Sequence, residues 1–153
     1  MFRAGFELAH RILSFPMPVV VACTGHAVAM GLFVVLSGDY RVGAAGPFKI
    51  VANEVALGIT LPLAAVEILR LRLTPATFNR ASLLSEPFTP ESALGAGVFD
   101  EIVAPADVSK TAQALALELV KLNPAAFAAT KLRVRAPTLA AIRAGIEADF
   151  GTG

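Results

Sequence analysis

Hydrophobic positions at the start of the chain follow a helical spacing and then give way to a continuous apolar run. The spaced residues are Phe2, Phe6, Ala9, Ile12 and Leu13. This spacing predicts an amphipathic helix over residues 2–14. Pro16 and Pro18 follow it, and proline cannot continue a helix because it donates no backbone hydrogen bond. The β-branched run from Val19 to Cys23 then predicts a short strand that is buried on both faces.

The next sixty residues alternate between short apolar segments and glycine or proline. A turn at residues 24–26 precedes a predicted buried helix over residues 30–36, and a second short strand is expected at residues 40–43. Residues 44–61 contain Gly46-Pro47 and Gly58 and are predicted as a loop.

Helix-start chemistry recurs in the second half of the chain. Threonine is followed by proline at residues 74–75 and again at 89–90. The threonine side chain can cap a helix start, and proline suits the first helical position because the N–H there has no partner within the helix. The predicted elements are helices at 62–71, 75–84 and 90–95, a strand at 98–103, and helices at 105–122, 124–135 and 138–150. Asn123-Pro124 and Ala136-Pro137 are expected to separate the last three helices.

Composition narrows the classes of function. The chain has 153 residues, one domain's worth, and is 56% hydrophobic but only 16% charged. So much apolar surface predicts a subunit interface, a missing partner segment or a membrane contact. The net charge of +1 gives no argument for nucleic-acid binding. The local cationic residues are expected to be solvated on helix faces: Arg70, Arg72, Lys131, Arg133 and Arg135.

Cysteine and histidine content limit the chemistry further. The single cysteine, Cys23, excludes an internal disulfide and fits a reducing, cytoplasmic compartment, where we expect it to be an inert core thiol. One cysteine and two histidines suggest no metal cluster. Residues 12–38 carry no charge, which leaves a membrane span as an alternative. Prolines and a Thr-Gly turn interrupt this stretch, so we expect two short elements and no membrane segment.

The predicted strands are too few to close a sheet on their own. Three or four short strands leave unpaired edges, which native proteins normally cover. The sequence therefore predicts that a segment pairing with these strands lies outside the chain.

Five stretches resemble, in order and spacing, the crotonase superfamily, also called the enoyl-CoA hydratase/isomerase family. They are residues 18–27, 31–42, 48–49, 53–59 and 93–103. The resemblance implies an α/β fold of the ClpP/crotonase type, a β/α spiral core without its N-terminal part. Residues 1–104 would form this partial core. Residues 105–153 would form the helical region through which the family assembles homotrimers or hexamers.

The resemblance also implies an active site. In the family two backbone amides hold the oxygen of an acyl-CoA thioester, and the matching donor here is the N–H of Met30, at a helix start where amides are unpaired. Ala29, Gly31 and Phe33 would bind substrate, although the family usually has glycine where Ala29 and Met30 stand. The second amide belongs to the family's N-terminal part.

The carboxylates distinguish the family's reactions. Family hydratases use two glutamates, and Phe33 occupies the position of one of them; Glu54 matches the other. The pair Asn53-Glu54 resembles family isomerases, so moving a proton from C2 to C4 of a 3-enoyl thioester is favoured over hydration. Apolar neighbours should raise the pKa of Glu54, which suits a general base.

No metal or redox cofactor is expected, since CoA is part of the substrate. A non-catalytic protein that binds acyl-CoA or serves assembly remains the alternative. His26 is expected to be structural. Asp39 and Arg41 resemble an Asp-x-Arg of the family that anchors backbone.

Overall fold

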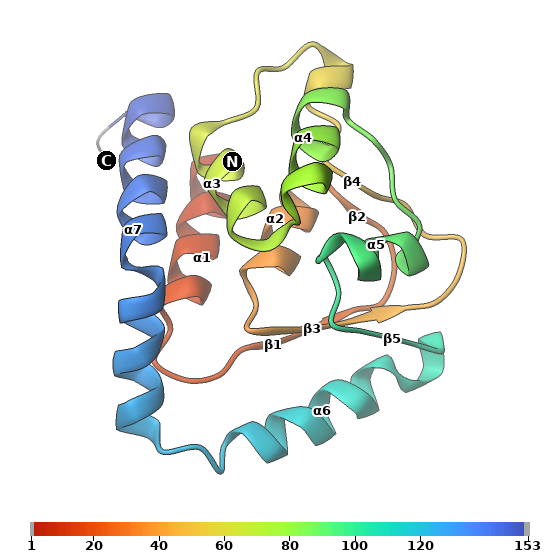
Figure 1. Ribbon diagram of the computed structural model, residues 1–153, viewed down its shortest axis with the longest axis vertical. Coiled ribbons are helices and arrows are strands. Elements are labelled where there is room, and N and C mark those ends of the chain that lie inside the picture. The colour runs from red at the N-terminus through yellow and green to blue at the C-terminus, as the bar shows by residue number, and fades with distance from the viewer. Residues whose placement is uncertain (1, 152–153) are drawn as a thin grey trace.

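The structure, a computed structural model, describes residues 2–151 and places a small parallel sheet among helices (Figure 1). The strands are β1 (Val20–Cys23), β2 (Ala27–Val28), β3 (Tyr40–Ala44), β4 (Ile50–Val51) and β5 (Glu101–Val103). The helices are α1 (Phe2–Ser14), α2 (Met30–Ser37), α3 (Leu63–Arg72), α4 (Pro75–Leu84), α5 (Pro90–Ala96), α6 (Val108–Leu119) and α7 (Pro124–Phe150). Two 3₁₀ turns, η1 (Val55–Leu57) and η2 (Pro105–Asp107), join them. None of the helices in this part of the chain has the length and apolar character needed to cross a membrane.

The main sheet is parallel, with strand order β1-β3-β5, and a separate parallel pair joins β2 to β4. α6 lies along one side of the main sheet and the remaining helices lie on the other side or at its end (Figure 1). The prediction that β1 is buried on both faces is wrong, because Ala22 is exposed. β1 is an outer strand that pairs only with β3 among the described residues, so no second strand shields it.

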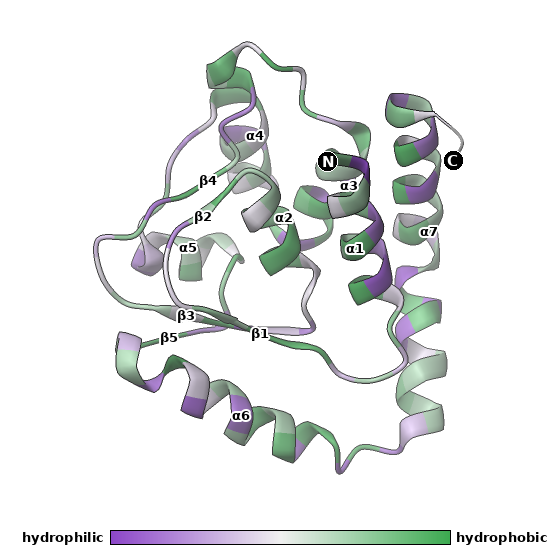
Figure 2. Ribbon diagram, turned by 180° about the vertical axis from the view of Figure 1, so that it is seen from behind, coloured by the Kyte–Doolittle hydropathy of each residue, from purple (hydrophilic) through white to green (hydrophobic). Residues whose placement is uncertain are grey.

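The cap signals are confirmed. The Thr74 hydroxyl accepts a hydrogen bond from the Thr77 N–H, and Thr89 forms a reciprocal capping box with Ser92. The apolar stripe of the first predicted helix is also confirmed, since Phe6, Ala9 and Leu13 are buried. Figure 2 shows the same two-sided character in α1, α6 and α7, whereas α2 is largely hydrophobic. Local sequence therefore accounts for most helix positions.

The predicted break at Pro137 is wrong, because Pro137 lies inside the single 27-residue helix α7. A proline within a helix costs about 3 kcal/mol, so long-range contacts must offset it. The second half of α7 packs on α1 and α3 (Figure 1). The first half is held by two buried cations, Lys131 and Arg135.

These cations contradict the expectation of solvated helix faces. Lys131 Nζ lies 2.7 Å from Asp39 Oδ2, and Arg135 Nη2 lies 2.8 Å from Asp39 Oδ1. The same aspartate accepts the Val19 N–H, and Arg135 donates to the Leu13 carbonyl. The predicted backbone-anchoring role of Asp39 is thus confirmed, and this cluster joins α7 to the connection between α1 and β1.

A second ion pair, between the buried Arg41 and the exposed Asp100, supports β3. Arg41 contacts both carboxylate oxygens of Asp100, at 3.0 and 3.2 Å, and donates to the Gly97 carbonyl. Its expected anchoring of backbone is therefore also confirmed. Arg72, predicted to be solvated, instead donates to the carbonyls of Leu36 and Gly38, and burial lowers its pKa to about 10.

The predicted loop over residues 44–61 is more ordered than expected. It contains β4, which pairs with β2 and bridges to Phe88, and the turn η1. His26 Nδ1 accepts the Lys49 N–H, which gives this histidine the structural role expected of it. The pairing was missed because two-residue strands leave no periodic signal. It matters for function, since β2 leads into α2 and β4 leads into Asn53 and Glu54.

Candidate active site

A cavity of about 340 Å³ lies between the start of α2, the segment that follows β4, α1 and the end of α7. Most of its lining is apolar, and three of its residues carry carboxylate or carboxamide groups. The lining residues are Phe2, Phe6, Ala29, Met30, Phe33, Asn53, Glu54, Leu57, Ile59, Thr60, Leu61, Pro62, Asp149 and Phe150. An apolar hollow with a few polar groups is typical of a small-molecule site.

The backbone at the start of α2 is held in an unusual conformation. Ala29 has φ +50° and ψ −122°, a region that favours glycine, and such strain costs on the order of 1–3 kcal/mol. The Ala29 N–H donates to the Val51 carbonyl, and its own carbonyl accepts from Leu32 and Phe33. These bonds fix the residue between the β2–β4 pair and the first turn of α2.

The two amides that follow are left without partners. Within residues 2–151, neither the Met30 N–H nor the Gly31 N–H donates to a protein acceptor. Unpaired amides at a helix start favour negative charge on a ligand. Met30 lines the cavity, so its free N–H belongs to a residue at the cavity wall.

Aromatic rings form one wall of the cavity. Phe33 is 1% exposed and stacks on Phe6, with ring centroids 5.8 Å apart, and Phe6 stacks in turn on Phe150 at 5.9 Å. The Met30 side chain reaches α1, where it fills the space beside Gly5. The side chains of this wall are apolar and offer no group that could hold a water molecule by a strong hydrogen bond.

Glu54 is the buried carboxylate of the site. It is 7% exposed, and its Oε2 atom has no hydrogen-bond partner among the described residues. Its carbonyl accepts from Leu57 and Ile59, so η1 and the left-handed Gly58 (φ +74°) close a tight turn around it. Burial raises the pKa of this carboxyl above its ordinary value, which its own backbone N–H offsets in part. A carboxylate in such surroundings is suited to accept a proton near neutral pH.

Two cavity residues were missed as site candidates. Asn53 Oδ1 is buried without a partner in the described part of the chain, beside Glu54 in sequence. Asp149 lines the cavity from the end of α7, and its Oδ2 accepts the Leu63 N–H at 2.7 Å. The Asn-Glu dipeptide was a signal for the first. No sequence signal pointed to the second, because α7 reaches the site only through its packing on α1 and α3.

The structure brings four of the five predicted site residues to one cavity: Ala29, Met30, Phe33 and Glu54. The fifth, Gly31, does not line it. Gly31 is exposed, and a side chain added there would meet nothing within 4 Å.

A family model, solved structures and curated relatives all point to the same protein family. The enoyl-CoA hydratase/isomerase family model matches residues 2–152. A crystal structure of an enoyl-CoA hydratase from Mycobacterium ulcerans is 55% identical with a TM-score of 0.93, covering 96% of this chain and 64% of that chain. A Mycobacterium tuberculosis protein, described as an enoyl-CoA isomerase with one solved structure and as a probable enoyl-CoA hydratase with another, is 54% identical in the first with a TM-score of 0.94, covering 98% of this chain and 67% of that one.

A curated relative agrees. A probable enoyl-CoA hydratase of Mycobacterium bovis is 32% identical over 120 residues, 78% of this chain and 46% of the relative. The chain therefore spans about half the length of curated relatives that it matches. The crotonase-type fold expected from the sequence is confirmed by these structural matches.

Proposed function

The chain belongs to the enoyl-CoA hydratase/isomerase family, and from that premise we propose that it acts on enoyl-CoA thioesters by shifting a double bond. The 3-enoyl thioester would enter the cavity at the start of α2 and leave as the 2-enoyl thioester. The observation that carries this proposal is Glu54, the single buried carboxylate among residues 2–151, in a cavity that Phe6, Phe33 and Phe150 also line.

The proposed reaction needs one proton carrier and one anion holder. The Glu54 carboxylate takes a proton from C2, and the C2–H electrons delocalise through the thioester and the C3–C4 double bond. The negative oxygen is stabilised by the Met30 N–H. Protonated Glu54 then returns the proton to C4, which leaves the double bond between C2 and C3. One such amide donor contributes about 2.7–4 kcal/mol to transition-state stabilisation.

Phe33 supports isomerisation over hydration. Hydration requires a held water molecule, and the fully buried Phe33 ring offers no acceptor. Asp149, the other carboxylate of the lining, is exposed and its Oδ2 accepts the Leu63 N–H, so we assign the proton transfer to the buried Glu54. The proposed chemistry moves only a proton, so it needs no metal or redox cofactor, and CoA enters with the substrate.

A proton-transfer assay tests the proposal. Glu54→Gln should abolish conversion of a 3-enoyl-CoA while binding of the same thioester, measured by calorimetry, stays within a few-fold. Glu118→Gln is the matched control, because Glu118 is exposed on α6 and pairs with Lys121. Unchanged turnover in Glu54→Gln would reject the catalytic role. Binding without turnover in the parent chain would favour the alternative, a non-catalytic acyl-CoA-binding protein.

We also propose that copies of the chain assemble through α6 and the first half of α7, as a homotrimer or hexamer in the cytoplasm. The support is an exposed apolar set on these helices and on the connection between them: Leu117, Val120, Leu122, Leu132 and Val134. Sedimentation of the parent chain and of Leu117→Lys compares their masses in solution. A monomeric parent would reject the assembly.

A further inference from the structure

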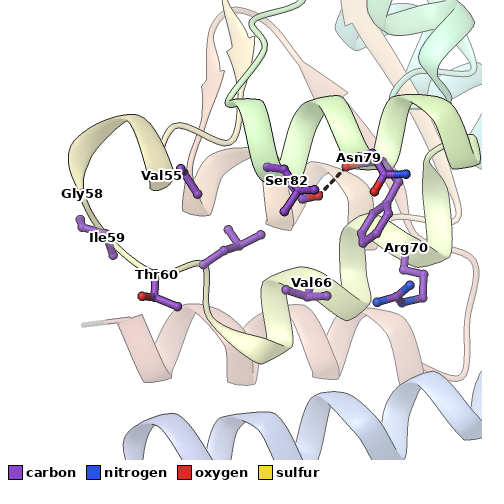
Figure 3. A pocket seen from close by; sticks show the side chains of 11 residues that line it. Val55, Gly58, Ile59, Thr60, Val66, Arg70, Asn79 and Ser82 are labelled. Atoms are coloured by element: carbon purple, nitrogen blue, oxygen red, sulfur yellow. Dashed lines mark hydrogen bonds between the residues drawn. The ribbon is translucent and has the colours of Figure 1, made fainter.

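A second pocket, of about 570 Å³, lies between α3, α4 and the segment after η1. Figure 3 shows Val55, Gly58, Ile59 and Thr60 at one end, and Arg70 and Asn79 at the other, with Val66 and Ser82 between them. Leu61, Phe78 and Leu83 complete the lining. The volume lies within the range of small-ligand sites, and most of the lining is apolar, with Arg70 as the charged residue at one end.

Arg70 is held in a way that leaves its donors free. Its guanidinium lies over the Phe78 ring, 4.6 Å from the centroid, so one face of the group is covered. Glu67 is its ion-pair partner, with 3.7 Å between Arg70 Nε and Glu67 Oε1, beyond hydrogen-bonding distance. Among residues 2–151, no acceptor forms a hydrogen bond with Arg70. A stacked guanidinium with open edges fits the two oxygens of a carboxylate.

The other polar groups near this end are already engaged. The Ser82 hydroxyl donates to the Phe78 carbonyl at 2.6 Å, and Asn79 Nδ2 donates to the Pro75 carbonyl at 3.3 Å. Arg70 therefore supplies the charge that selects a ligand, while Val66, Ile59 and Leu83 supply apolar contact.

We propose that this pocket binds a medium-chain fatty carboxylate, with its chain between α3 and α4 and its carboxylate on Arg70. The occupant follows from charge complementarity at one end and apolar walls along the rest. Ile59, Thr60 and Leu61 line both this pocket and the Glu54 cavity, so the two sites are neighbours divided by one segment of chain. The site does not depend on the function proposed for Glu54.

Titration calorimetry of the full chain with submicellar decanoate tests the site. Arg70→Gln should weaken decanoate binding about tenfold or more, the order expected for loss of a charge-assisted contact. The matched control is Arg80→Gln on α4, because Arg80 is also exposed but pairs with Glu86 at 3.3 Å and does not line the pocket. Decanol should bind more weakly than decanoate, and Arg70→Gln should not change decanol binding.

Three results would overturn the assignment. They are no saturable binding of decanoate, equal loss in the two arginine variants, and equal binding of decanoate and decanol. A fourth arm locates the ligand: Glu54→Gln should leave decanoate affinity unchanged. If Glu54→Gln changes it and Arg70→Gln does not, the carboxylate occupies the first cavity and the proposal is wrong. Loss of isomerase activity in Glu54→Gln would still stand, so the two proposals fail separately.

Discussion

Replacing Glu54 with glutamine should stabilise the folded chain at neutral pH, although it removes the proposed catalytic group. The wild-type carboxylate is 7% exposed and Oε2 lacks a partner in the described structure. A buried polar group without a hydrogen bond costs about 1–3 kcal/mol, and more when charged. Glutamine keeps the shape and still needs hydrogen-bond partners, so it relieves only the part of this cost that comes from burying a charge. We therefore expect the unfolding free energy of Glu54→Gln to exceed that of the parent by about 1–2 kcal/mol.

The stability gain of Glu54→Gln should depend on pH, and the raised pKa of Glu54 fixes the direction of that dependence. Burial raises the folded-state pKa of Glu54 above its ordinary value of 4.5, so folding disfavours the charged form. The resulting instability is fully present above the folded pKa and disappears as the pH falls toward the unfolded pKa. The advantage of Glu54→Gln should therefore shrink in mild acid. An Asp or Glu with a lowered pKa would behave in the opposite way.

Urea denaturation, followed by far-UV circular dichroism at neutral and mildly acidic pH, measures both effects. Glu118→Gln is again the control, since both partners of the Glu118–Lys121 pair are exposed and such pairs contribute only about 0–1 kcal/mol. If Glu54→Gln were no more stable than the parent at neutral pH, the carboxylate would not be buried and unpaired. If its advantage persisted unchanged in acid, the gain would not come from removing charge.

Four further substitutions test the backbone conformations and the buried ion pairs of the fold. Ala29→Gly should raise the unfolding free energy, measured by urea denaturation, by about 1 kcal/mol, because glycine adopts φ +50° without strain. A lower unfolding free energy in this variant would show that the Ala29 backbone is not strained. Asp39→Asn should cost about 3–5 kcal/mol, since two buried cations lose their counter-charge, and a cost under about 1 kcal/mol would contradict that burial. Gly95→Ala should stabilise by about 0.5–1 kcal/mol, because a side chain meets open space in a helix. Gly97→Ala should lower the thermal midpoint, because the φ of Gly97 is +93° and an added side chain would lie 2.6 Å from the Arg72 carbonyl oxygen. If the thermal midpoint shifted in the same direction in Gly95→Ala and Gly97→Ala, the predicted difference between these two glycines would be refuted.

Helix starts and apolar faces could be predicted because their causes lie within a few residues. Thr74 and Thr89 cap the helices that follow them by bonding amides three positions on. The stripe of Phe6, Ala9 and Leu13 is a property of one helix alone. The candidate roles of Met30 and Glu54 came from family resemblance, which local spacing alone could not supply.

Contacts across the fold decided what local signals could not. Pro137 argues for a break, yet α7 continues because α1 and α3 pack on it and Asp39 binds its cations. The sequence around Lys131 suggests a solvated lysine, but in the fold its ammonium group binds Asp39, which lies 92 residues earlier in the chain. The cavity has the same origin: α1, α2, the segment after β4 and the end of α7 each supply a wall. The burial that raises the pKa of Glu54 depends on how distant segments pack, whereas a cap or a helical stripe acts over a few neighbouring residues.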